Sequence, residues 1–125
     1  MLEKITGAIT SAINHLENSM KALVKKDEKV MMGFVWRAAS DLEYALFFFS
    51  IMQQEYEGFS GKLDLHLKQV EVGPALISAQ DLLKEAKSSV DAGEIREAHK
   101  KTWVARSYIF KVQETFEKKK SSTSY

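Results

Sequence analysis

The residues with the most suggestive chemistry lie in one helical register near the C-terminus. They are His99, Trp103, Arg106 and Phe110. Spacings of four, three and four residues place these side chains along one side of an α-helix. Aromatic rings beside a guanidinium and an imidazole can pack against a protein partner or stack on nucleic-acid bases. This set, the aromatic row, therefore predicts a recognition surface rather than a catalytic centre.

The same segment carries a second apolar row, which a bundle helix would use as its core seam. This seam consists of Ala98, Thr102, Ala105, Ile109, Val112 and Phe116. One apolar stripe is enough to attach a helix to a core. The aromatic row is therefore left for another partner.

An equivalent row occurs in a second long apolar segment. It consists of Trp36, Ser40, Glu43 and Phe47. That segment also has a core seam of its own, formed by Phe34, Ala38, Leu42, Ala45, Phe49 and Met52. On a third side, Arg37 and Asp41 are four residues apart, a spacing that predicts an ion pair within the helix.

The remaining reactive residue types form no catalytic or metal-binding motif. The chain has no cysteine, which excludes disulfides, thiolate catalysis and Cys-ligated zinc. His15, His66 and His99 lack the Glu-x-x-His spacing of di-metal bundles. The six glycines are scattered and form no phosphate-binding loop. We expect no enzymatic activity, no cofactor and no bound metal.

Arg96 and His99 nevertheless resemble part of a known nuclease motif. Helical nucleases of the HEPN superfamily carry an Arg and a His near the start of a late helix in an antiparallel bundle, separated by four to six residues. Here only Glu97 and Ala98 intervene, which places the two side chains about 60° apart around the helix. The resemblance implies an alternative function, an RNA-binding or RNA-cleaving bundle, and the spacing is where this chain departs from that family.

Hydrophobic periodicity predicts four helices, at about 2–26, 28–57, 74–90 and 94–119. Asp27 is expected to cap the second helix and Gly58 to end it. Pro74 is expected to begin the third helix. Residues 91–93 are expected to form a turn.

The region from 59 to 73 is predicted to be an irregular or short-helical connector. Leu63, Leu65 and Leu67 alternate with polar residues, as in a half-buried strand. An isolated strand would have no hydrogen-bonding partner. Leu63, Leu67 and Val70 fit a short helix equally well. Helix, strand and loop therefore remain open for this region.

These elements predict an all-α, antiparallel up-down four-helix bundle. One domain is expected over residues 1–120, followed by a polar tail at 121–125. The chain of 125 residues is 45% hydrophobic and 28% charged, which is typical of a globular domain. Its formal net charge of +1 argues against a strongly basic grip on nucleic acid.

The apolar runs predict neither a membrane span nor an export signal. The strongest run, residues 45–52, is far shorter than the ~20 residues that cross a bilayer. Residues 1–18 mix polar and apolar groups and lack the continuous apolar segment of a secretory signal. We therefore expect a cytoplasmic protein that does not contact membranes.

Three interpretations of the two aromatic rows follow. Both rows could belong to the core of a bundle whose helices bury more than half of their circumference. They could form a homodimer interface, since interfaces favour aromatic residues and Arg. They could also line a groove for an unknown protein partner or for nucleic acid, with Lys100, Lys101 and Lys111 near phosphates. The leading hypothesis is a non-enzymatic interaction module that self-associates as a homodimer. Its predicted surface consists of Trp36, Phe47, His99, Trp103, Arg106 and Phe110.

Overall fold

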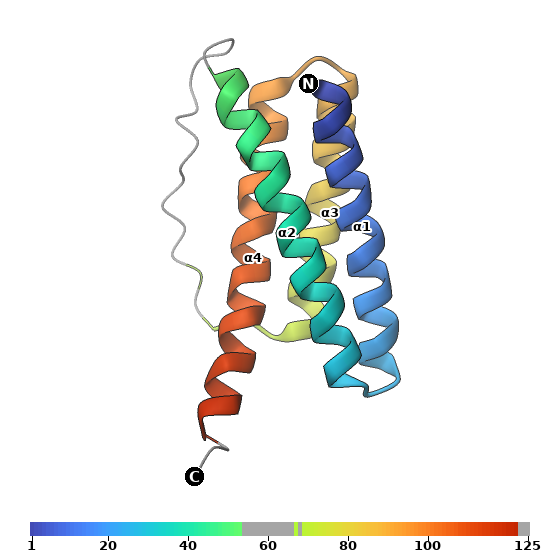
Figure 1. Ribbon diagram of the computed structural model, residues 1–125, viewed down its shortest axis with the longest axis vertical. Coiled ribbons are helices and arrows are strands. Elements are labelled where there is room, and N and C mark those ends of the chain that lie inside the picture. The colour runs from blue at the N-terminus through green and yellow to red at the C-terminus, as the bar shows by residue number, and fades with distance from the viewer. Residues whose placement is uncertain (54–66, 68, 123–125) are drawn as a thin grey trace.

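The computed structural model describes residues 1–53, 67 and 69–122, with side chains described up to residue 118. Within these residues the chain forms four helices and no strand (Figure 1). They are α1 (Leu2–Val24), α2 (Glu28–Met52), α3 (Val72–Asp91) and α4 (Ile95–Ser122). The predicted all-α bundle is confirmed.

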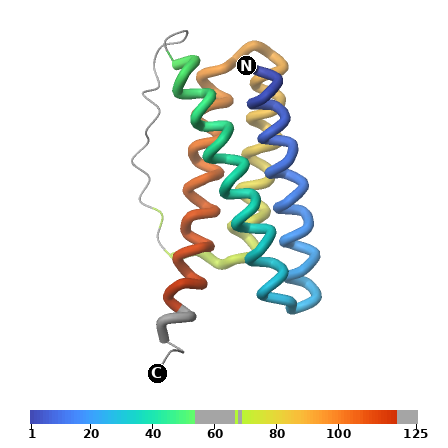
Figure 2. The backbone as a smooth tube through the Cα atoms, viewed as in Figure 1, coloured from blue at the N-terminus to red at the C-terminus, as the bar shows by residue number. Residues whose placement is uncertain are grey.

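Each helix packs against two others in a closed ring, in the order α1, α2, α4, α3. Side-chain contacts fix the directions. Lys4 lies over the ring of Phe48, so the start of α1 lies beside the end of α2. Likewise Gly73, at the start of α3, lies next to Leu23, at the end of α1. Helices that pack against each other are therefore antiparallel (Figures 1 and 2), but the strict up-down alternation expected along the chain is not found.

The helices follow each other around this ring in an order that the sequence did not reveal. Consecutive helices α2 and α3 occupy opposite corners and run in the same direction (Figure 2). Two helical hairpins, α1–α2 and α3–α4, therefore pack side by side. Short connectors favour a neighbouring position for the next helix. The end of α2 and the start of α3 are separated by 19 residues in the sequence, so they are not joined by a short connector.

The turn between α1 and α2 satisfies the last carbonyl groups of α1. Lys26 adopts a left-handed conformation, with φ of 60°. Its N–H donates to the carbonyl of Leu23 at 3.0 Å, and the N–H of Asp27 donates to the carbonyl of Ala22 at 3.0 Å. This pair of bonds is a Schellman motif. Asp27, the last residue of the motif, is also the N-cap residue of α2.

The turn between α3 and α4 repeats this arrangement. It lies at Ala92 and Gly93, so Asp91 of the predicted 91–93 turn belongs to α3. Gly93 takes the left-handed position, with φ of 79°, where glycine carries no steric penalty. Its N–H donates to Val90 at 3.0 Å, and the N–H of Glu94 donates to Ser89 at 2.8 Å. Both hairpins are therefore closed by the same backbone geometry.

The predicted cap of α2 is confirmed and leads to a testable prediction. The Asp27 carboxylate accepts a hydrogen bond from the N–H of Val30 at 3.2 Å. Asp27→Ala should lower the free energy of unfolding by about 1 kcal/mol, because that N–H loses its protein partner. Urea denaturation measures the loss. Asp81→Ala, at an exposed position in the middle of α3, is the control. Equal losses in the two variants would show that the cap contributes nothing.

Four boundaries differ by two residues or more from the sequence expectations. Helix α1 ends at Val24 rather than at Lys26. Helix α3 begins at Val72 rather than at Pro74. Pro74 fits within the first turn because N–H groups there have no acceptor inside the helix, so the N–H that proline lacks costs no hydrogen bond. Helix α2 ends at Met52 rather than at Glu57, and the predicted stop at Gly58 lies outside the described residues.

At the C-terminus, α4 continues to Ser122 and so includes two residues assigned to the polar tail. Residues 123–125 of that tail lie outside the described part. Of the predicted connector, Leu67 and residues 69–71 are described and lie outside the helices.

The core follows the predicted seams closely. On α4, five of the six seam residues are buried, and Phe116 is partly buried against them. On α2, Phe34 is the one seam residue that is only partly buried. Polar contacts also join the helices. The Gln80 side-chain amide on α3 donates to the carbonyl of Ile13 at 3.2 Å and to the carboxylate of Glu17 at 3.0 Å, both on α1.

The predicted Arg37–Asp41 pair within α2 is replaced by contacts of a different kind. Asp41 instead accepts a hydrogen bond from His15 Nδ1, on α1, at 2.7 Å. Arg37 lies over the ring of Phe34, 5.3 Å from its centroid. Asp41 therefore stabilises the α1–α2 contact rather than the helix that carries it.

Candidate interaction surface

The side that α2 and α4 share contains several large exposed apolar side chains. Trp36 and Phe47 on α2 are 55% and 59% exposed, and Phe110 on α4 is 51% exposed. Monomeric proteins leave single apolar residues in solvent, but contiguous exposed patches mark interaction sites. The question is whether these rings lie on one surface.

Contacts between α2 and α4 fix the positions of these rings along the bundle. The ring of Phe49 stacks on His99, and further along Glu43 pairs with Arg106. Beyond that, Trp36 and Gln113 line a common groove. In this antiparallel register, Phe47 and Trp103 lie on one side of the Glu43–Arg106 pair, and Trp36 and Phe110 lie on the other. The α2–α4 face, as we define it, comprises Trp36, Glu43, Phe47, Trp103, Arg106 and Phe110.

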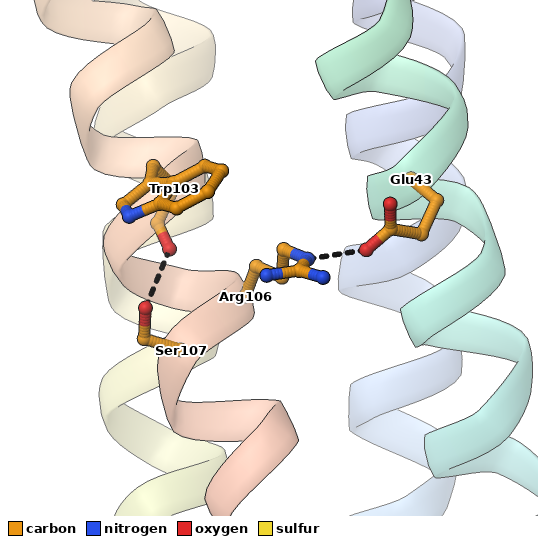
Figure 3. A network of polar contacts seen from close by, with 4 residues as sticks. All are labelled: Glu43, Trp103, Arg106 and Ser107. Atoms are coloured by element: carbon orange, nitrogen blue, oxygen red, sulfur yellow. Dashed lines mark hydrogen bonds and ion pairs between the residues drawn. The ribbon is translucent and has the colours of Figure 1, made fainter. Parts of the chain in front are cut away.

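Arg106 is the centre of this face. Its Nε donates to the Glu43 carboxylate across the helix boundary, as Figure 3 shows. The guanidinium also lies over the Trp103 ring, 5.3 Å from the centroid, in a cation–π arrangement. Two contacts thus hold Arg106 in place, and the guanidinium charge is offset by Glu43.

Trp103 belongs both to the face and to the bundle. Its side chain is partly buried and packs against the hydrophobic core. Ser107 Oγ donates to the backbone carbonyl of Trp103 at 3.1 Å, one turn along the helix (Figure 3). Trp103 therefore contributes less free surface than Phe110, and its removal would disturb the core as well as any interface.

His99 does not lie on the predicted surface. It is only 2% exposed, and its ring stacks on Phe49 with centroids 4.9 Å apart and planes 3° apart. Burial lowers the pKa of His99 to about 4, because the charged imidazolium would lose its hydration. The position of His99 in the aromatic row predicted an exposed side chain, and this prediction is wrong. The helix turns this part of the row towards α2, which covers it.

The two residues that resemble the HEPN motif lie in different environments. Arg96 is exposed, and its guanidinium lies 3.7 Å from the Glu97 carboxylate. His99 is buried against α2. A nuclease site would need both side chains to reach a phosphate from the same surface.

A groove that the sequence did not indicate lies beside Trp36, between the start of α2 and the last described turns of α4. Its volume is about 610 Å³. Met32, Trp36 and Phe116 supply apolar walls, and Gln113 lines the groove between them. No sequence signal could have identified it, because its lining comes from α2 and α4, which are far apart in the sequence.

Two further features bear on the kind of site this is. Among the described residues, no group of three His, Asp or Glu side chains is arranged to hold a metal ion. In the same part of the chain, no helix combines the length and apolar character that a bilayer crossing requires.

Comparisons with known proteins give no lead. No family model, curated protein or solved structure matches this chain. A functional proposal must therefore rest on the chemistry of the surface itself.

Proposed function

We propose that the protein is a non-enzymatic interaction module that forms a homodimer through the α2–α4 face. The observation that carries this proposal is the exposure of Trp36, Phe47 and Phe110 on both sides of a cross-helix ion pair. Trp, Phe and Arg are the residue types enriched at protein interfaces. Large contiguous apolar patches are also rare on the surfaces of monomers.

The charges of the face suit contact with a second copy of itself. A two-fold interface brings the same patch of both subunits together. An unbalanced charge at its centre would therefore lie next to an identical charge of the second subunit and be repelled by it. Here the central charges, on Glu43 and Arg106, already offset one another within each chain. The rings on either side can therefore meet apolar groups without isolating a charge.

The strength of this association follows from the exposed area. Burying the remaining half of an exposed Trp or Phe contributes about 1 kcal/mol. Three rings from each of two subunits then give about 6 kcal/mol, which lies within the ~4–15 kcal/mol that association costs. We therefore expect a dimer that forms and dissociates with concentration, supported by the smaller contacts around the rings.

The alternative, an RNA-binding or RNA-cleaving bundle, has less support. Its two motif residues do not share a surface, because His99 is buried and Arg96 is exposed. A low pKa also keeps His99 neutral at physiological pH, without the positive charge that attracts phosphate.

Light scattering coupled to size-exclusion chromatography tests the homodimer. Across a concentration series, the wild-type mass should rise from the monomer value of 14.2 kDa towards twice that value. Phe110→Glu should keep the monomer mass over the whole series, because a carboxylate in the interface would lose its hydration.

The matched control for this experiment is Ile77→Glu. Ile77 is 52% exposed, as Phe110 is, but it lies on α3, away from the α2–α4 face. This variant should associate like the wild type. A wild type that stays monomeric at every concentration would refute the proposal, and so would equal effects of the two glutamate variants.

A further inference from the structure

The outward side of α2 carries a row of residues that is symmetric about its own midpoint. The spacings along this row alternate between three and four residues, and all of its positions are exposed. Its members are Gly33, Trp36, Ser40, Glu43, Phe47 and Ser50. From either end, the row contains a small residue, then an aromatic residue, then a polar one. It therefore matches a second copy of itself that runs in the opposite direction.

The outward side of α4 has a similar symmetry, with opposite charges at its two ends. Its midpoint is that of its two aromatic residues, Trp103 and Phe110. Basic residues on one side of this midpoint and acidic residues on the other lie at equal distances from it, to within one residue. They are Arg96 and Lys100 before it, and Glu114 and Glu117 after it. This row therefore also complements a reversed copy of itself.

The two midpoints lie at the same level of the bundle. The rings of Phe49 and His99 stack face to face, which places these two residues side by side on α2 and α4. Counted from this pair along the antiparallel helices, the midpoint of the α2 row meets that of the α4 row. The Glu43–Arg106 pair gives the same level to within one residue (Figure 3). One two-fold axis that lies in the interface and crosses both helices therefore serves both rows.

This axis would bring different rings of the two copies together, as a two-fold interface requires when a residue is away from the axis. On α2, Phe47 would lie opposite Trp36 of the partner subunit. On α4, Trp103 would lie opposite Phe110 of the partner subunit. Each contact would occur twice, and aromatic pairs of this kind stabilise an interface beyond the area that they bury. All four rings of the face are thus used.

The charges on α4 favour this arrangement over the other two-fold arrangement, in which like ends meet and α2 packs on α4 of the partner subunit. With opposite ends together, Lys100 lies near Glu114 of the partner subunit, and Arg96 lies near Glu117 of the partner subunit. With like ends together, both basic residues would lie against the end of α2, where the exposed residues between 47 and 52 are uncharged. Exposed charges of this kind fix orientation more than they add affinity.

We propose that the homodimer is antiparallel, with its two-fold axis across α2 and α4 at the level of the Glu43–Arg106 pair. Each of these helices packs on the same helix of the partner subunit. This inference rests on the proposed self-association and specifies which residues meet. The small residues Gly33 and Ser50 lie opposite each other across the interface, where they leave room for the rings.

Cross-linking between two single-cysteine variants, Gly33→Cys and Ser50→Cys, tests this arrangement. In the antiparallel dimer the two positions face each other, whereas each lies about 25 Å along the helix from its own equivalent. A short bis-maleimide should therefore link the two variants when they are mixed and leave each variant alone unlinked. A Cβ added at Gly33 meets no atom within 4 Å, and Ser50 is exposed.

The matched control is a mixture of Ser50→Cys with Lys100→Cys, which lie close together across the interface only if like ends meet. This mixture should give no cross-link. Efficient linking of Ser50→Cys with Lys100→Cys would overturn the antiparallel arrangement. So would a mixture of Gly33→Cys and Ser50→Cys that stays unlinked although light scattering reports the dimer mass for both.

Charge reversal gives a second test, which decides the matter if a cysteine prevents association. Lys100→Glu should weaken the dimer about tenfold, because two attractions become repulsions. Adding Glu114→Lys should return the dissociation constant to within about twofold of the wild type, although Glu114 also pairs with Lys111 in its own chain at 3.0 Å. Circular dichroism checks that each variant keeps its helices. A double variant as weak as Lys100→Glu alone would contradict the antiparallel arrangement.

These outcomes separate the arrangement from the dimer itself. A wild type that is monomeric at every concentration refutes self-association and this inference with it. A wild type that dimerises, but links Ser50→Cys with Lys100→Cys or shows no recovery in the double variant, refutes the arrangement alone.

Discussion

Lowering the pH from 7 to 4 should reduce the free energy of unfolding by about 3 kcal/mol through His99 alone. Burial lowers the pKa of His99 from 6.5 to about 4 in the folded chain. Between these values the unfolded chain binds a proton that the folded chain does not. Stability from this residue is therefore fully present above pH 6.5, falls as the pH drops, and reaches its lower limit below pH 4.

The measurement is urea denaturation at a series of pH values, with His99→Phe beside the wild type. Phenylalanine keeps a ring against Phe49 but cannot titrate. Subtracting the two pH profiles removes the contributions of carboxylates, which both proteins share. The difference should change by about 3 kcal/mol between pH 7 and pH 4. Parallel profiles would show that folding does not lower the pKa of His99. His99→Leu is measured in the same way, so that the result does not depend on how well phenylalanine packs at this position.

Local patterns predicted the helices and their buried sides well. The seam on α4 was readable because six residues recur at intervals of three and four, a period that belongs to the helix itself. The cap at Asp27 was readable for the same reason, since its hydrogen bond to Val30 spans only three residues.

Features that depend on neighbouring helices could not be read from one segment. The spacing of His99 matches that of Trp103 and Phe110, yet α2 covers His99 and leaves Phe110 half exposed. Similarly, Asp41 pairs with His15 on another helix rather than with Arg37 on its own. Spacing defines which side chains share a helix face, but the packing of the bundle decides which of them meet solvent.

The order of the helices around the bundle also depends on contacts between segments that are far apart in the sequence. This order decides which residues of different helices lie together. The sequence does not indicate that α2 lies beside α4. It therefore could not predict that Glu43 pairs with Arg106 or that Gln113 lines a groove with Trp36. The proposal of a recognition surface on these two helices was a pattern argument. The structure adds the contacts that bring the residues of that surface together and removes His99 from it.

A single introduced cysteine tests the homodimer most directly, because the chain has none of its own. Ser40 is exposed on α2, in the same row as Trp36 and Phe47, and Ser88 is exposed on α3. With a short bis-maleimide, Ser40→Cys should give a covalent dimer in high yield, and Ser88→Cys should remain monomeric. Adding Phe110→Glu to Ser40→Cys should abolish the product, since it opposes burial of the face. Equal cross-linking of Ser40→Cys and Ser88→Cys, or none of either at concentrations where light scattering reports a dimer, would place the contact elsewhere and contradict the account.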